Sequence, residues 1–286
     1  MAASRAALIL TLFTVVASAL LAASTTCTSN ETAPLQKAPP PEPPMTVYLV
    51  THARGGCAPN CEQWIAAEGR IIRGSLAQFQ IAIGQISKSD VPVLIHSSGG
   101  LVDEAMAIGR LIHGKGLDVA VAKTTFTPCT PDDAACLRKA GTAPLRGLPE
   151  RGGAACASAC AFVLAGGKRR YVRPPAFVGV HSHAHTNMPD RLFERYEQYF
   201  AEMGIEKEIV PLMKATPNDS IHWLTRDELH STRMATHRLD GDQLVRGEII
   251  ADDGWLEPMP PPVADFECEL TGDGCSRHFT PAAPSH

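Results

Sequence analysis

The feature that most constrains the fold is an apolar run that ends in two glycines. Residues 91–96 are largely apolar, and Ser97-Ser-Gly-Gly100 follows them as a turn signal. Residues 101–113 then carry apolar side chains at helical spacing, and residues 117–122 form another apolar run. A strand, a helix and a strand in this order favour a crossover connection between two parallel strands. The sequence therefore predicts an α/β fold with a largely parallel sheet and flanking helices.

The rest of the chain continues this alternation. Short apolar runs predict strands at 46–50, at 62–72 with a bend at Gly69, at 170–172 and at 177–181. Helical spacing predicts helices over 75–86, 158–164 and 190–214. The aromatic stripe of residues 190–214 is typical of a core face or of a contact in a homo-oligomer.

Residues 124–153 show no clear element except a turn of helix near 134–140. A stretch of this length inside a compact domain is usually a lid, a binding loop or disordered. A surface excursion is the alternative. We expect an insertion here, with a disulfide between Cys129 and Cys136 as one means of holding it.

The two ends of the chain are predicted to lie outside the domain. Residues 1–24 carry Arg5, then an uncharged apolar run and small residues, as in a cleaved export signal. An uncleaved membrane anchor is the alternative, and only that form would associate with a membrane. Residues 25–44 and 258–286 are rich in proline, so they predict a spacer and a tail around a domain at 45–257. A periplasmic or secreted protein is expected.

The net charge of −4 and the isoelectric point near 6.3 give no electrostatic case for binding nucleic acid. Apart from Cys27, the nine cysteines fall into four local pairs: Cys57/Cys61, Cys129/Cys136, Cys156/Cys160 and Cys268/Cys275. Local disulfides are expected in an oxidising compartment, although spacing alone does not settle the connectivity. Zinc is the alternative, but the spacings are not those of common zinc sites and no pair has a nearby histidine.

Three segments carry residues suited to acyl transfer. Ser158 lies in Cys156-Ala-Ser-Ala-Cys160 and is expected at the start of an apolar helix. His181 ends a predicted strand, and Gly99-Gly100 can present backbone N–H groups at a tight turn. A nucleophile, a base and oxyanion donors are the parts of a serine hydrolase. A packing role for Ser158 is the alternative.

His181, His183 and His185 alternate at the end of a strand and so share one face. Three imidazoles on one face would suit zinc. No fourth ligand is evident in the sequence, so we expect no metal and place His183 and His185 at the rim of the site.

The chain resembles the proteolytic subunit of the Clp protease, within the Clp/crotonase superfamily, and more closely the predicted exported serine proteases of that group. Four segments carry the resemblance in the family's order: residues 94–100, 156–169, 174–181 and 223–228. The resemblance implies a crotonase/ClpP-like fold over about residues 62–240.

Carried over residue by residue, the resemblance implies Ser158 as nucleophile and His181 as base. The backbone N–H groups of Gly100 and Ala159 match the two oxyanion donors. The implied substrate is a peptide or protein, and no cofactor is needed.

The family's acid would align with Ile221. The nearest carboxylate, Asp219, is therefore the expected third member, with Asp190 as the fallback. An enzyme without its acid usually loses much of its rate but not all of it.

Two features argue against a simple transfer of the family's activity. The insertion at 124–153 lengthens the interval between Gly100 and Ser158, and an exported chain would have no ATP-driven unfoldase. The alternative to a hydrolase is a non-catalytic binding or scaffold protein that keeps the fold. The missing acid, and strain from a disulfide across Ser158, would favour that alternative.

Overall fold

A computed structural model describes the central part of the chain and two short strands near its end. The described residues are 42–56, 61–87, 90–131, 133, 135–136, 145–150, 152–172, 175–183, 189–237, 268–271 and 274–277. All of them belong to one compact unit, Pro39–His286. The predicted export signal and most of both proline-rich segments lie outside the described residues. None of the described helices is long and apolar enough to cross a membrane.

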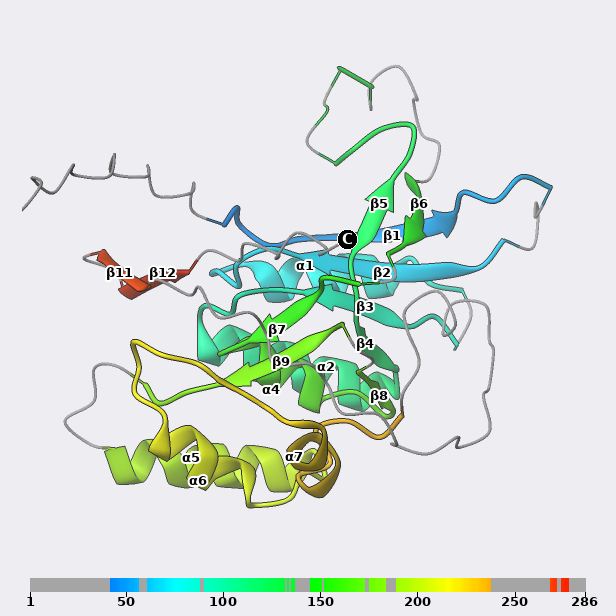
Figure 1. The fold of residues 1–286 in the computed structure, drawn as a ribbon. Helices are drawn as coiled ribbons and strands as arrows, with labels where there is room; N and C mark the ends of the chain where they lie inside the picture. The colour runs from blue at the N-terminus through cyan, green and yellow to red at the C-terminus, as the bar shows by residue number, and fades with distance from the viewer. Residues whose placement is uncertain are drawn as a thin grey trace, which may run out of the picture. The chain divides into compact units, whose positions relative to one another are not determined.

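The main sheet has seven strands in the order β5-β6-β1-β2-β3-β4-β8 (Figure 1). Their bounds are β1 Thr46–His52, β2 Gln63–Glu68, β3 Val93–His96, β4 Val119–Val121, β5 Thr124–Phe126, β6 Leu145–Pro149 and β8 Arg170–Tyr171. Four neighbouring pairs are parallel, while β1–β2 and β5–β6 are antiparallel. The expected α/β architecture, with a largely parallel sheet and flanking helices, is confirmed.

A second sheet has the order β10-β9-β7. Its strands are β7 Ala155–Ala157, β9 Phe177–Val180 and β10 His222–Trp223, and β7 and β9 are parallel. The sequence analysis missed β7, whose three small residues are all buried. Two further strands, β11 Cys268–Thr271 and β12 Gly274–Arg277, form an antiparallel hairpin by themselves.

Six helices complete the described part of the unit. They are α1 Ser75–Gly84, α2 Val102–Lys115, α4 Cys160–Ala165, α5 Pro189–Glu202, α6 Ile209–Ala215 and α7 Arg226–Ser231. Helix α2 ends at Gly116, which takes the left-handed conformation that glycine favours at this position. Helix α7 begins with a reciprocal capping pair, Thr225 and Glu228. In Figure 1, α2 and α4 lie between the strands and the group formed by α5–α7.

Helices α2 and α4 pack unusually closely through two glycines. A Cβ built on Gly166 would lie 2.2 Å from the backbone oxygen of Gly109, and a Cβ built on Gly109 would lie 2.6 Å from the backbone oxygen of Phe162. Neither position therefore has room for a side chain. Helix α5 covers this contact with the aromatic stripe that was predicted for it. The Tyr199 hydroxyl donates to the Phe162 backbone oxygen over 2.6 Å. The ring of Phe162 stacks on that of Phe200, with centroids 4.8 Å apart.

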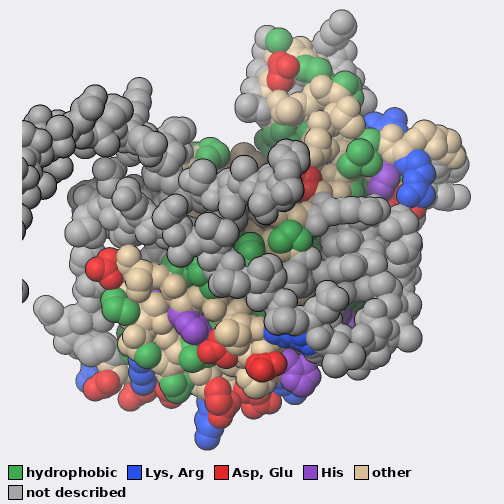
Figure 2. Space-filling model, viewed as in Figure 1, with side chains coloured by type: hydrophobic (Ala, Val, Ile, Leu, Met, Phe, Trp, Pro, Cys, Tyr) green, Lys and Arg blue, Asp and Glu red, His purple; other side chains and the backbone are tan. Residues whose placement is uncertain are grey.

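The aromatic face of α5 is therefore part of this chain's own core: Tyr196, Tyr199 and Phe200 are all buried. A homo-oligomer through this helix stays a prediction. The outer surface of the same region is polar, and charged side chains of both signs gather over α5–α7 in Figure 2. Arg195 pairs there with Asp103 of α2, over 2.5 Å.

The predicted single helix over 190–214 is wrong, because the structure divides it into α5 and α6. Gly204 has a φ of +69°, which ends the first helix in a left-handed turn. The Ile205 N–H then donates to the Phe200 backbone oxygen over 2.9 Å and closes that turn. The apolar spacing continues through the break. It therefore indicated one continuous helix, although Gly204 is a residue at which a helix can end.

The expectation that residues 124–153 lack clear elements was also wrong in part. Both ends of the segment are strands, β5 and β6, which pair with each other and extend the main sheet through β1. A buried hydrogen bond of 2.9 Å from the Trp64 indole N–H to the Thr124 hydroxyl fixes the start of β5. Trp64 lies far from Thr124 in the sequence, so no local sequence pattern indicated where β5 begins.

Candidate active site

Three strand ends meet at the edge of the second sheet. In the parallel pair β7–β9, Ala157 lies opposite Gly179, so the residues that follow these strands emerge at the same edge. The end of β3 joins them, because Ser97 forms an isolated bridge with Cys156. The two ends of this bridge are hydrogen-bonded: Ser97 N–H donates to Ala155 and Ala157 N–H donates to Ser97. This convergence brings three of the predicted site segments together.

Ser158 and His181 are in direct contact. The His181 Nε2 atom lies 2.6 Å from Ser158 Oγ, and both residues are half-buried. The Ser158 backbone N–H donates to the Gly179 oxygen over 2.8 Å, which ties the serine to the strand that carries the histidine. This hydrogen-bond distance is the one that general-base activation of a hydroxyl requires.

The backbone of Ser158 differs from the sequence-based expectation. The residue does not begin a helix: it has a φ of +56°, and α4 starts two residues later at Cys160. A left-handed residue cannot continue a right-handed helix, so Ser158 forms the turn between β7 and α4. A serine on a strained strand-to-helix turn projects its hydroxyl out of the backbone, as nucleophiles in several hydrolases do.

The Gly99-Gly100 turn lies against this serine. A Cβ on Gly99 would lie 2.7 Å from the Ser158 Cβ and 2.9 Å from the Ala159 nitrogen. The Ser97 hydroxyl accepts the Gly99 N–H over 3.1 Å. The backbone of Ile71 pairs with the residues before and after Gly100. Its N–H donates to the Gly99 oxygen, and its oxygen accepts the Leu101 N–H.

These bonds leave two backbone N–H groups beside Ser158. Within the described residues, neither the Gly100 N–H nor the Ala159 N–H donates to any acceptor. Both were predicted as oxyanion donors, and the observed turn is compatible with that role. The role itself stays a prediction.

The two candidate acids lie on the surface. Asp219 is exposed in the turn that follows Pro217, and its carboxylate makes no hydrogen bond or ion pair within the described part of the chain. Asp190 is exposed in the first turn of α5. The structure does not bring either carboxylate to His181, so a role for Asp219 stays a prediction.

His183 lies near the site but interacts with the core helix α5. Its Nδ1 is 3.2 Å from the Tyr196 hydroxyl, and its side chain is exposed. This position agrees with a residue at the rim. His185, the third histidine of the alternating set, lies outside the described residues.

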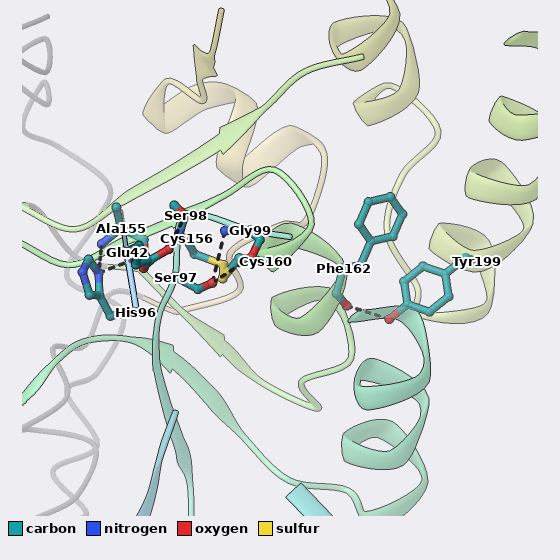
Figure 3. The surroundings of a disulfide bond; sticks show 10 residues. All are labelled: Glu42, His96, Ser97, Ser98, Gly99, Ala155, Cys156, Cys160, Phe162 and Tyr199. Atoms are coloured by element: carbon teal, nitrogen blue, oxygen red, sulfur yellow. Dashed lines mark hydrogen bonds between the residues drawn. A yellow bond between two sulfur atoms is a disulfide. The ribbon is translucent and has the colours of Figure 1, made fainter. Parts of the chain in front are cut away.

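Glu42 is a contact of the site that the sequence analysis missed. Its carboxylate accepts hydrogen bonds from both the backbone N–H and the hydroxyl of Ser98, the residue before Gly99 (Figure 3). The neighbouring Pro43 oxygen accepts the Arg70 N–H over 2.8 Å. The end of the proline-rich spacer is thus held on the glycine turn. Composition alone indicated only an extended spacer there.

Two half-buried ionisable groups lie at the ends of β2 and β3, where Glu68 and His96 are register partners. The Ala155 N–H donates to His96 Nδ1 over 3.0 Å, so the imidazole supports the strand that leads to Ser158. Burial, together with the Lys123 charge, lowers the pKa of His96 to about 4. Burial also raises the pKa of Glu68 to about 7, although its carboxyl accepts the Thr124 N–H.

The expectation of local disulfides is confirmed for two pairs, Cys129–Cys136 and Cys156–Cys160. Cys61 is disulfide-bonded as well. The side chains of Cys268 and Cys275 lie outside the described residues.

No protein-family model matches the chain, and the curated proteins contain no relative that matches it. Among solved structures, ClpP1 from Listeria monocytogenes is similar at 16% identity, with a TM-score of 0.39, over 60% of this chain and 88% of that chain. A variant of the 1510-N membrane-bound stomatin-specific protease is similar at 16% identity, with a TM-score of 0.44, over 63% of this chain and 81% of that one. Another variant of that protease, in complex with a substrate peptide, is similar at 15% identity with a TM-score of 0.43. We draw no conclusion about activity from likenesses at this level.

Proposed function

We propose that this chain is an exported serine hydrolase that cleaves peptide bonds, with Ser158 as nucleophile and His181 as general base and acid. The observation that carries the proposal is the 2.6 Å contact between His181 Nε2 and Ser158 Oγ on a left-handed strand-to-helix turn. This pairing is the geometry of an activated nucleophile.

The first half of the reaction forms an acyl-enzyme. Ser158 Oγ attacks the carbonyl carbon of the scissile bond while His181 Nε2 takes the hydroxyl proton. The negative charge that develops on the carbonyl oxygen is stabilised by the N–H groups of Gly100 and Ala159. Collapse of the tetrahedral intermediate breaks the C–N bond, and His181 delivers its proton to the leaving amine.

The second half releases the acyl group. His181 takes a proton from water, which attacks the ester carbonyl, and the proton returns to Ser158 Oγ as the C–O bond breaks. All steps use acid–base chemistry of the chain's own residues, and the proposal includes no cofactor. In this proposal Asp219 is the group that orients His181.

Export is part of the proposal and rests on the apolar segment of residues 1–24 and on the disulfides. Disulfides persist in oxidising compartments such as the periplasm and the cell exterior. A peptide, rather than a small ester, is proposed as substrate from the resemblance to the Clp proteolytic subunit.

The direct test is to incubate the oxidised full chain with a defined mixture of unfolded peptides and to identify new termini by mass spectrometry. We expect cleavage by the wild type and none by Ser158→Ala. Ser231→Ala is the matched control, because Ser231 is an exposed serine on α7, and it should cleave like the wild type. Absence of cleavage by the folded wild type would contradict a peptidase and favour a binding protein that keeps the fold.

A further inference from the structure

The disulfide Cys156–Cys160 spans the proposed nucleophile. Cys156 is the central residue of β7 and Cys160 is the first residue of α4, so the bond connects strand and helix across the turn that holds Ser158. Figure 3 shows the bond beside Ser97 and Gly99. It closes a ring of five residues with Ser158 at its centre. Neither cysteine has a role in the reaction as proposed above.

The conformation enclosed by this ring is unfavourable for a serine. At a φ of +56°, the Cβ of an L-residue approaches the following carbonyl, so a free chain would rarely hold Ser158 in this state. Two local backbone hydrogen bonds support it: Ser158 N–H to Gly179, and Ala161 N–H to the Ser158 oxygen. The disulfide adds a covalent constraint on both sides of the same residue.

The surroundings leave little room for the two sulfur atoms to separate. Cys156 and Cys160 are both 0% exposed, and the intervening Ala157 and Ala159 are buried. Two thiols cannot approach as closely as two bonded sulfurs, because non-bonded contacts are longer than covalent bonds. After reduction the two sulfurs must therefore move apart inside a packed core, which presses on β7 and α4 on either side of Ser158.

A shift of β7 would also move the Gly99-Gly100 turn, which carries a proposed oxyanion donor. Cys156 is bridged to Ser97, and the Ala157 N–H donates to the Ser97 oxygen. Gly99 follows two residues later and lies against Ser158. The bond therefore constrains the nucleophile directly and the oxyanion donors indirectly.

We infer that Cys156 and Cys160 are positioning residues, and that their disulfide is what holds Ser158 in the reactive geometry. This inference rests on the proposed function. Formation of the bond oxidises two thiols, and the two electrons and two protons pass to a disulfide oxidant, which becomes two thiols. Reduction by a dithiol reverses the exchange. The hydrolase is thus slowed in a reducing compartment and becomes fully active where the disulfide forms.

The test measures how fast a fluorophosphonate probe labels Ser158 in the full-length chain. Three proteins are compared, oxidised and after reduction with dithiothreitol: the wild type, Cys156→Ala/Cys160→Ala and the control Cys129→Ala/Cys136→Ala. The control also loses one local disulfide, but from the segment between β5 and β6. Alkylation and mass spectrometry establish which bonds are open in each sample.

We expect reduction to slow labelling of the wild type and of the control at least tenfold, with recovery after oxidised glutathione is added. Cys156→Ala/Cys160→Ala should label slowly in both states. The endpoint should remain one probe per chain. A purely structural loss would instead lower the number of probes per chain and leave the rate constant of the folded fraction unchanged. If the double variant does not fold, the reduced wild type supplies the same comparison.

Two results would overturn the inference in different ways. If the oxidised and reduced wild types label at the same rate, the disulfide does not position Ser158, while the hydrolase proposal stands. If the oxidised wild type does not label at all, the proposed function fails and the inference fails with it.

Discussion

Gly99 lies so close to Ser158 that a side chain on the glycine would collide with the serine's own Cβ. The calculated separation is 2.7 Å, and real Cβ atoms do not approach other carbons to that distance. The backbone of the glycine turn and the nucleophile turn therefore fit together without a gap. The alignment of the two predicted oxyanion donors depends on this contact.

Gly99→Ala should abolish the reactivity of Ser158. The added methyl group must push the serine or the glycine turn aside, and a shift of about 1 Å at a reacting group lowers rates about 100-fold. We expect the rate of fluorophosphonate labelling to fall by at least that factor.

Gly74→Ala controls for backbone strain alone. Gly74 has a φ of +94°, close to the +110° of Gly99, but nothing lies within 4 Å of its Cβ position. This variant should lose about 1 kcal/mol of folding stability and label at the wild-type rate. Equal labelling by wild type and Gly99→Ala would contradict the close packing described here.

The half-buried carboxyl of Glu68 should make folding stability depend on pH. Its pKa of about 7 in the folded state exceeds the unfolded value of 4.5, so the carboxyl favours the folded state fully below pH 4.5. As the pH rises from 4.5 to 7, the unfolded chain ionises first and this stabilisation is lost, by about 3 kcal/mol in total. Glu68→Gln should remove that loss, as measured by urea unfolding across this pH range.

His96 should make folding stability depend on pH in the opposite direction. Its pKa of about 4 in the folded state lies below the unfolded value of 6.5, so stability is lost as the pH falls through this interval. The two slopes overlap between about pH 4.5 and 6.5, where they offset each other in the wild type. Glu68→Gln should therefore expose a fall in stability below pH 6.5. An unchanged pH profile in this variant would show that Glu68 is not buried as described.

The close contact of α2 with its neighbours predicts that Gly109→Ala destabilises the fold. A Cβ at this position would lie 1.8 Å from the Tyr199 hydroxyl oxygen and 2.6 Å from the Phe162 backbone oxygen. Overpacking of this kind costs about 1–3 kcal/mol, and we expect the upper end because a backbone atom must move. The measurement is the free energy of unfolding in urea.

Gly114→Ala is the matched control in the same helix. Nothing lies within 4 Å of its Cβ position, so only the helix propensity changes. Alanine exceeds glycine there by up to about 1 kcal/mol, and the variant should be as stable as the wild type or more so. A destabilised Gly114→Ala with an unaffected Gly109→Ala would contradict the helix packing.

The strands and helices with strong periodicity were predictable from the sequence. The run before His96 and the spacing after Gly100 correspond to β3 and α2, because burial on one face leaves a regular pattern. Strand β7 was not predictable in this way, since three small residues have no period. The break at Gly204 was overlooked because the apolar spacing on either side is helical.

The candidate site was predictable as far as the contact between Ser158 and His181. The resemblance in four ordered segments implied that these two residues pair. Strand β7, whose end shares an edge with that of the parallel strand β9, was not predicted. The left-handed turn at Ser158 was not predictable, because its neighbours read as the start of a helix. Contacts from distant segments, such as Glu42 on Ser98, leave no local signal at all.

The most direct test of the central claim is fluorophosphonate labelling of the oxidised full-length chain, with the labelled residue located by peptide mass spectrometry. We expect one probe per chain on Ser158, no label on Ser158→Ala, and labelling at least 100-fold slower in His181→Ala. Labelling of another serine, or equal labelling of the His181→Ala variant, would contradict an activated Ser158–His181 pair.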